Sequence, residues 1–311
     1  MFNEKRELIF STVKLSTILF IIFCGIAVLI WKITGNRFYL SNFIGIGLII
    51  AIGWGANNFV SKRNKEIVRL GSQIFIGSYI FLYIGILGRV NFQLEGFFIC
   101  FIEGFFSGAA LQYLVSKIFG PIIFARAYCG WSCWTAMILD FLPYRICRNG
   151  RIKWFGAVRY VHFFISLGIV LIAVYVFQIN RTFDTTSRMF RWFIIGNVVY
   201  YVVGISLAII LKDNRAFCKY FCPIPFIMKI TSRFSLLKIK IDNKKCSECG
   251  VCEKECPMNV KIIDYKKENK RVLSTECILC FKCVHGCKMN AASATFGLDC
   301  GIREKINFKS N

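Results

Sequence analysis

Two cysteine runs with the same spacing lie in the C-terminal part of the chain. The first reads Cys246-Ser-Glu-Cys249-Gly-Val-Cys252-Glu-Lys-Glu-Cys256-Pro257, and the second reads Cys277-Ile-Leu-Cys280-Phe-Lys-Cys283-Val-His-Gly-Cys287-Lys288. Three thiolates this close along the chain can bind three corners of an iron–sulfur cube, and in two-cluster proteins the fourth cysteine of each run binds the other cluster. The spacing therefore predicts two [4Fe–4S] clusters.

The crossed pattern assigns four cysteine ligands to each cluster. The first cluster takes Cys246, Cys249, Cys252 and Cys287. The second cluster takes Cys277, Cys280, Cys283 and Cys256. Zinc and disulfides are the alternatives, but zinc sites separate two cysteine pairs by a longer gap, and a reducing compartment disfavours disulfides.

The whole chain has the composition of a membrane protein. Its 311 residues are 56% hydrophobic, and 40 Lys and Arg against 17 Asp and Glu give a net charge of +23. A soluble domain this apolar would carry more charge of both signs, and a nucleic-acid-binding protein this basic would be less apolar. We therefore expect an integral membrane protein with basic loops and no nucleic-acid partner.

Six stretches are long and apolar enough to cross a bilayer as helices of about 20 residues. They are Leu8–Ile30, Phe38–Val60, Ile67–Gly88, Gly96–Phe119, Val158–Gln178 and Trp192–Leu211. Lys and Arg are concentrated in the segments that six crossings would place on the same side as both termini, which is the cytoplasmic side by the positive-inside rule. We expect a multi-pass cell-membrane protein whose termini and cysteine-rich domain are cytoplasmic.

An eight-residue pattern occurs twice between the spans. Its copies begin at Arg126 and Arg215, lie 89 residues apart, and both read Arg-Ala-aromatic-Cys-x-aromatic-x-Cys. Each copy follows a pair of predicted spans, so we expect two duplicated helical hairpins related by an axis along the membrane normal.

The duplicated pattern supplies four further cysteines, which are Cys129, Cys133, Cys218 and Cys222. Cysteines at i and i+4 share one face of a helical turn. Four sulfurs brought to one point at the cytoplasmic surface suit a metal ion or an additional iron–sulfur centre. Small residues at a helix contact are the alternative, and a bound centre and cycling dithiols both remain open at this point.

The predicted fold is an α-helical membrane protein of six transmembrane helices, with a core of two duplicated helical hairpins, plus a small α+β two-cluster ferredoxin-like domain. Its predicted parts are an N-terminal hairpin (1–66), a four-helix membrane domain (67–237), the two-cluster domain (238–292) and a tail (293–311). Glu103 falls inside the fourth predicted span, where ionisable groups are costly. We expect it to accept protons in quinol oxidation or, alternatively, to reach the far interface.

Together these motifs resemble the membrane polyferredoxins of the NapH/MauN type, over about Ile67 to Ala292. Relatives of that family include the C-terminal part of NosR and the oxidase assembly factor CcoG. The resemblance implies membrane electron transfer, with electrons taken from quinol in NapH-like proteins and copper reduced by CcoG-like ones. The chain departs from the family at Trp134, where the family has proline, and it lacks the flavin-attachment sequence of NosR.

We therefore predict a membrane-bound electron-transfer protein that relays electrons between a cytoplasmic or quinol donor and a partner redox protein. A copper reductase or assembly factor and a membrane redox sensor are the alternatives. Expected partners are membrane lipid, quinone and a ferredoxin, flavodoxin or membrane reductase subunit. The sequence has no Gly-rich dinucleotide loop, so we expect an electron carrier or oxidoreductase subunit, such as a quinol dehydrogenase, that does not itself take hydride.

Overall fold

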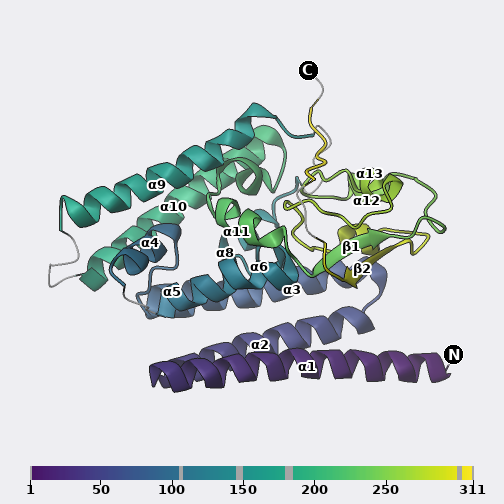
Figure 1. The fold of residues 1–311 in the computed structure, drawn as a ribbon, viewed down its shortest axis with the longest axis horizontal. Coiled ribbons are helices and arrows are strands. Elements are labelled where there is room, and N and C mark those ends of the chain that lie inside the picture. The colour runs from purple at the N-terminus through teal and green to yellow at the C-terminus, as the bar shows by residue number, and fades with distance from the viewer. Residues whose placement is uncertain (1, 105–107, 145–149, 179–184, 300–302, 310–311) are drawn as a thin grey trace. The chain divides into compact units, whose positions relative to one another are not determined.

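The computed structural model of the chain divides it into two compact units, Met1–Ile76 and Gly77–Asn311 (Figure 1). The structure describes residues 2–104, 108–144, 150–178, 185–299 and 303–309.

The first unit is built on a pair of packed helices, α1 (Phe2–Thr34) and α2 (Arg37–Phe59). The chain turns between them at Gly35, whose φ of 70° is a conformation that favours glycine. The next residue, Asn36, caps α2 by accepting a hydrogen bond from the Phe38 backbone N–H at 2.9 Å. A short 3₁₀ turn, η1 (Lys62–Asn64), then leads into α3 (Lys65–Ser78).

Four helical stretches in the described residues are long and apolar enough to cross a membrane. They are Ser16–Thr34, Lys65–Leu87, Trp154–Tyr175 and Ser187–Leu211, while Arg37–Gly53 and Ala110–Phe124 are shorter apolar helices. The second of the four joins α3 to the π-helix η2 (Tyr79–Leu87). The last two contain α9 (Val158–Tyr175) and α10 (Thr185–Leu211).

The prediction of one continuous helix over Gly96–Phe119 is wrong. Helix α4 (Leu94–Ile102) ends at Glu103, and Gly104 follows with a φ of 66°, a left-handed conformation that ends helices. Residues 105–107 lie outside the described part. The chain resumes as α5 (Gly108–Tyr113), which continues through the π-helix η3 (Leu114–Phe119) into α6 (Gly120–Phe124).

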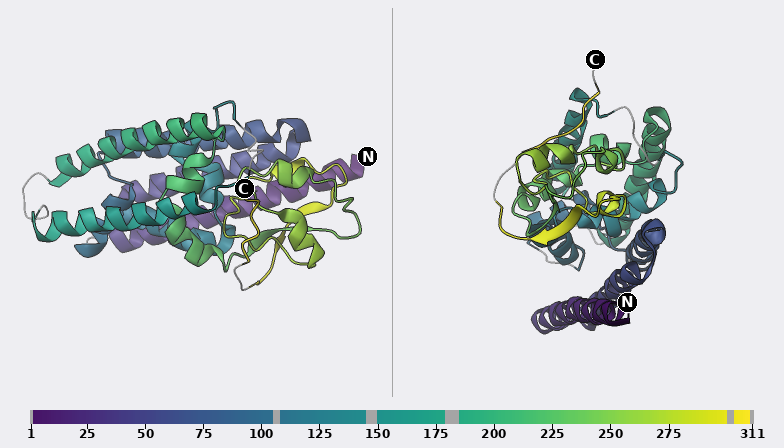
Figure 2. Two further views of the ribbon diagram at one scale, coloured as in Figure 1. Left: turned by 90° about the horizontal axis from the view of Figure 1, so that it is seen from above. Right: turned by 90° about the vertical axis from the view of Figure 1, so that its right-hand side faces the viewer.

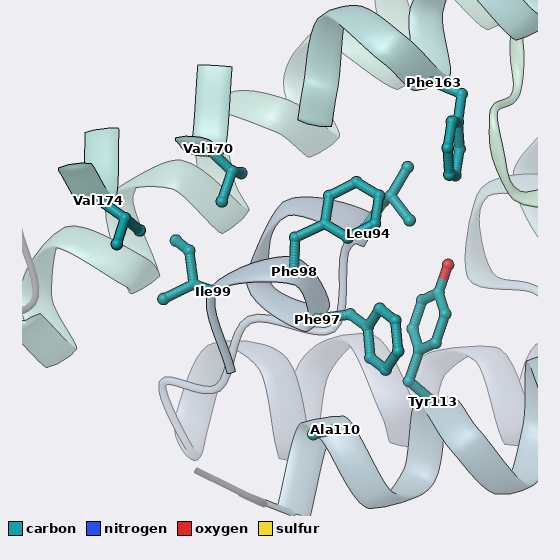
Figure 3. Packing of buried hydrophobic residues seen from close by; sticks show 9 residues of the cluster. All are labelled: Leu94, Phe97, Phe98, Ile99, Ala110, Tyr113, Phe163, Val170 and Val174. Atoms are coloured by element: carbon teal, nitrogen blue, oxygen red, sulfur yellow. The ribbon is translucent and has the colours of Figure 1, made fainter. Parts of the chain in front are cut away.

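Helix α4 packs between α5 and α9 (Figure 3). The Phe97 ring stacks on Tyr113 of α5 with centroids 4.3 Å apart, and the Phe98 ring meets Phe163 of α9 edge-on at 5.5 Å. Five aliphatic side chains complete this buried cluster: Leu94, Ile99, Ala110, Val170 and Val174. Because α4 is fixed by these contacts, a run that is apolar enough to span has folded into two shorter helical pieces that pack on each other.

Short helices connect the long ones at the end where α9 begins and α10 ends. They are α7 (Ala127–Trp131), α8 (Trp134–Leu139), η4 (Trp154–Ala157), η6 (Phe217–Phe221) and α11 (Ile224–Ser232). The cysteine-rich region lies at this same end (Figures 1 and 2). The duplicated cysteine turns are therefore between the long helices and the C-terminal region.

The cysteine-rich region has a two-stranded antiparallel sheet. Strand β1 (Leu237–Ile241) pairs with β2 (Ala292–Phe296), and Leu237 lies opposite Phe296. The connection between the strands carries α12 (Val251–Lys254), α13 (Ile262–Lys267) and α14 (Lys282–His285). The chain therefore combines a mostly helical membrane part with a small α+β region.

Candidate iron–sulfur sites

The two cysteine runs have the same backbone conformation, 31 residues apart. Helices α12 and α14 occupy equivalent positions in the two runs. Three pairs of equivalent residues have positive φ: Glu248 and Leu279, Gly250 and Phe281, Asn259 and Asn290. Non-glycine residues rarely adopt this conformation, so its repetition shows that both runs form the same loop.

Each run contributes to two cavities in the crossed manner. The cavity that we call the outer cavity is lined by Cys246, Cys249, Cys252 and Cys287. The cavity that we call the inner cavity is lined by Cys256, Cys277, Cys280 and Cys283. Four thiols within a largely apolar lining suit a [4Fe–4S] cluster, whose protein ligands are four cysteine thiolates.

Backbone amides point at the fourth cysteine of each run. The Val260 N–H donates to Cys256 Sγ at 3.4 Å, and the equivalent Ala291 N–H donates to Cys287 Sγ at 3.3 Å. Hydrogen bonds to cluster sulfurs are one of the means by which a protein sets the reduction potential. The two cavities therefore match in backbone donors as well as in cysteines.

The two cavities differ in their surroundings. Cys249 of the outer cavity is exposed, and so is Met289, which also lines it. Cys283 of the inner cavity is buried. The outer cavity is therefore the more exposed of the two.

The first cysteine turn packs directly on the loop of the inner cavity. The Trp131 indole N–H donates to the Leu279 carbonyl at 2.9 Å, and its ring lies edge-on to Phe281. Gly130 is so close to this loop that a Cβ there would lie 2.5 Å from the Ile278 carbonyl oxygen. Only glycine permits this approach without a shift of the backbone.

The second cysteine turn contacts the same cavity through Lys219, which occupies the position of Gly130 in the repeat. The ammonium of Lys219 is fully buried and lies 2.6 Å from Asp213 Oδ2. It also donates to the side-chain oxygen of Asn259, which follows Cys256 by three residues. Both turns therefore contact loops that carry inner-cavity cysteines.

Each cysteine turn packs against the other copy of the repeat, and this brings the four turn cysteines near one another. Cys129 Sγ lies 3.7 Å from the sulfur of Met228, on the helix that follows the second turn. The equivalent residue of the first copy, Leu139, packs in a cluster with Cys218. Burial raises the pKa of the Cys218 thiol to about 12, opposed by the nearby Arg215 and reinforced by thiols of the first turn.

The arginines that begin the two copies of the repeat are both buried. Arg215 donates to the Cys129 carbonyl at 2.8 Å and pairs with Asp140 at 2.5 Å. Asp140 corresponds to Lys229 in the second copy, so the repeat itself offers no carboxylate to Arg126. Glu276, directly before Cys277 in the cysteine-rich region, supplies it at 2.9 Å.

Glu276 is 1% exposed and pairs with four cations. They are Arg126 at 2.9 Å, Arg151 at 3.1 Å, Arg159 at 2.9 Å and Lys229 at 2.7 Å. Burial by itself would raise the pKa of this carboxyl, but the four cations hold it well below its usual range. The sequence analysis did not predict this cluster. The signal that could have found it is the charge reversal between the equivalent residues Asp140 and Lys229 of the repeat.

The predicted proton acceptor, Glu103, is exposed and forms the C-cap of α4. A second glutamate that sequence reasoning missed, Glu95, lies in the first turn of α4 and accepts a hydrogen bond from the Ser166 hydroxyl at 2.8 Å. Its other carboxylate oxygen and the hydroxyls of Tyr113 and Tyr200 are buried without a hydrogen-bond partner in the described part of the chain. These three groups interact electrostatically.

No three Cys, His, Asp or Glu side chains among the described residues converge closely enough to hold a single metal ion. This holds for the turn cysteines and for both cavities. Cysteines that bind a cube of four irons are spread around its corners and do not meet at one atom. The thiols of the two cavities can therefore serve as cluster ligands without meeting at one point.

Two family models match the chain. A 4Fe-4S dicluster domain covers residues 238–288, and a 4Fe-4S binding domain covers residues 114–152 and 197–242, which include both cysteine turns. The chain is therefore similar to the NapH/MauN-type membrane polyferredoxins. Its cofactors are two [4Fe–4S] clusters, and membrane-associated electron transfer is its function. This confirms the resemblance that the motifs indicated.

Three relatives illustrate what this chain is similar to. An uncharacterized protein of Methanocaldococcus jannaschii is 28% identical over 227 residues, which cover 65% of this chain and 89% of the relative. The ferredoxin-type protein NapH of Haemophilus influenzae is 26% identical over 189 residues, 58% of this chain and 64% of NapH. The methylamine utilization protein MauN of Paracoccus denitrificans is 26% identical over 148 residues, 46% and 52% of the two chains. No solved structure matches.

Proposed function

We propose that this protein relays single electrons between a redox protein that docks at the outer cavity and a third cysteine-ligated centre at the two turns. Cys246, Cys249, Cys252 and Cys287 hold one cluster in this proposal. Cys256, Cys277, Cys280 and Cys283 hold the other. When bound, the clusters supply one-electron chemistry.

The contact of both turns with the inner cavity is the observation that carries this order. Trp131 of the first turn and Lys219 of the second bind loops of the inner cavity, whereas Cys249 of the outer cavity is exposed. The outer cavity therefore faces a ferredoxin, a flavodoxin or a reductase subunit, and the inner cavity faces the membrane part.

Two observations support an iron–sulfur centre at the turns. The 4Fe-4S binding-domain model covers both of them. Their four thiols interact with one another electrostatically, yet they do not converge as ligands of a single ion do. A copper reductase or assembly factor and a redox sensor that carries no sustained flux are the alternatives.

Quinol is the second candidate partner, and Glu95 favours it over Glu103 as the proton acceptor. Oxidation of a quinol releases two protons for every two electrons. The Glu95 carboxylate is held inside the helical part by Ser166 and has one oxygen free of hydrogen bonds in the described residues. Such a group is suited to take a proton from a hydroxyl. The turns, both termini and the cysteine-rich region lie on the cytoplasmic side in this proposal, as the positive-inside rule indicates.

Anaerobic purification in detergent with iron and sulfide analysis tests the proposal. Three [4Fe–4S] centres require about twelve irons per chain, and the two clusters alone require about eight. Replacement of Cys129 and Cys222 by serine should remove about four irons and leave the EPR signals of the other two clusters unchanged. Eight irons in both proteins would refute the third centre.

Copper bound by the wild type but not by the double variant would favour the metal reductase. Flux from reduced ferredoxin to a quinone in proteoliposomes would exclude a pure sensor.

A further inference from the structure

Lys117 is a buried cation without a carboxylate. It lies on η3, inside the membrane part, and is 4% exposed. Its ammonium lies 3.8 Å from the ring centroid of Tyr128, 5.3 Å from that of Tyr113 and 5.4 Å from that of Trp134. Within the described part of the chain, it has neither an ion pair nor a hydrogen bond.

The ammonium faces the rings of Tyr128 and Trp134, which adjoin Cys129 and Cys133 in the chain. It interacts electrostatically with Cys129 and Cys133 of the first turn and with Cys222 of the second. Three other buried cations near these thiols, Arg126, Arg215 and Lys219, are already paired with Glu276, Asp140 and Asp213. In the described residues, these carboxylates balance the charges of the other cations and leave that of Lys117 without a paired anion.

The repeat does not require a lysine here. The equivalent residue of the second copy is Ser206, so the duplicated fold forms on one side without a charge. A buried ammonium is costly unless an anion faces it, and three aromatic rings offset only a part of that cost. Neutral thiols or disulfides at the turns would leave the charge uncompensated.

A centre with four thiolate ligands supplies the missing negative charge. A [4Fe–4S] centre with four cysteine thiolates carries about −2 when oxidised, and about −3 after it accepts one electron. A fixed positive charge nearby stabilises the reduced state more than the oxidised state, because the attraction grows with the charge of the centre.

We propose that Lys117 is the buried counter-charge of the centre held by Cys129, Cys133, Cys218 and Cys222, and that it raises the reduction potential of that centre. This inference rests on the third centre proposed above. Lys117 does not bind the centre in this proposal. It contacts the Tyr128 ring, and its positive charge acts electrostatically on the turn thiols.

The test compares full-length wild type with Lys117→Met, Lys117→Arg and Lys153→Met, all purified anaerobically. Lys153 is an exposed lysine and serves as the control for loss of one positive charge. The readouts are iron content and an EPR-monitored redox titration. At a fixed potential near the midpoint, Lys117→Met should lower the reduced-to-oxidised ratio of the turn centre about tenfold, equivalent to about 59 mV for one electron. Lys117→Arg and Lys153→Met should leave that ratio nearly unchanged.

The outcomes separate this inference from the proposed third centre. A turn centre whose ratio is the same in Lys117→Met and wild type would overturn the role of Lys117 and leave the centre standing. Absence of a third signal in the wild type would overturn both. Loss of about four irons in Lys117→Met, with full iron in Lys117→Arg, would support a charge requirement, whereas equal loss in both variants would contradict it.

Discussion

The carboxylate of Glu276 lies 2.9 Å from the guanidinium of Arg126, and the two side chains are 1% and 0% exposed. Glu276 directly precedes Cys277, and Arg126 precedes Cys129 by three residues. This ion pair therefore joins a loop of the inner cavity to the first cysteine turn. Three further cations around the same carboxylate come from other segments, so one residue fixes the cysteine-rich region on the membrane part.

Replacement of Glu276 by glutamine should release this docking. Removal of one partner from a buried ionic cluster costs about 3–5 kcal/mol because the remaining charges stay buried. We expect a lower thermal unfolding temperature in detergent and faster proteolytic release of the C-terminal region. Glu268→Gln is the matched control, since Glu268 pairs with three cations but its side chain is 31% exposed. An equal effect of both variants would contradict a special role of Glu276.

The contribution of Glu276 should not change with pH in the neutral range. Burial would raise the pKa of this carboxyl, but its four cations lower it well below the usual range. A depressed pKa gives stability that is present above the unfolded pKa of about 4.3 and lost only as pH falls through the folded value. The stability difference between wild type and Glu276→Gln should therefore be constant from about pH 8 to about pH 5.5. A difference that shrinks within this range would contradict the assigned charge state.

Replacement of Gly130 by alanine should separate the first turn from the inner cavity. Its Cβ would lie 2.5 Å from the Ile278 carbonyl oxygen, so the backbone must move, at a cost of about 1–3 kcal/mol. We expect slower electron transfer from reduced ferredoxin to a membrane acceptor, with unchanged iron content. Gly156→Ala is the control, because a Cβ there meets no atom within 4 Å. Equal rates in the two variants would show that this contact does not matter for transfer.

Serine at the fourth cysteine of each run tests the crossed ligand sets. Cys287→Ser should perturb the cluster of the outer cavity, and Cys256→Ser the cluster of the inner cavity. EPR of each variant against Cys249→Ser, a variant of the outer cavity alone, distinguishes the two sets. The Cys287→Ser spectrum should resemble that of Cys249→Ser. Resemblance of Cys256→Ser to Cys249→Ser would instead indicate that each run binds its own cluster.

Replacement of Glu95 by glutamine should slow quinol oxidation more than replacement of Glu103. Glu95 is held by Ser166 within the helical part, whereas Glu103 is exposed at the end of the same helix. A positioned proton acceptor contributes about 10²–10⁴-fold to a rate, so we expect a loss of this order in Glu95→Gln with a reconstituted quinol. The Glu103→Gln variant should stay near the wild-type rate. The reverse ranking would restore Glu103, and no loss in either would argue against quinol as the donor.

The local spacing of cysteines and apolar residues was sufficient to predict the cluster ligands and the membrane class of this protein. The two cysteine runs indicated two clusters and their crossed ligands because three thiolates a few residues apart can bind three irons of one cube, and the structure lines its two cavities with those same sets. Apolar run length and the Arg-Ala-aromatic-Cys pattern likewise indicated a membrane protein with two equivalent turns. These properties are local, and the sequence therefore contains them directly.

The tertiary structure alone decided the remaining features, because they depend on residues far apart in the chain. Apolarity cannot distinguish one long helix from two shorter packed ones, so the break at Gly104 and the half-buried Glu95 were missed. Glu276 pairs with a cation 150 residues away in the chain. The electrostatic interaction of Lys117 with thiols of both turns likewise exists only in the folded chain. The price of burying a charge is set by what surrounds it in three dimensions, and this surrounding is what the fold supplies.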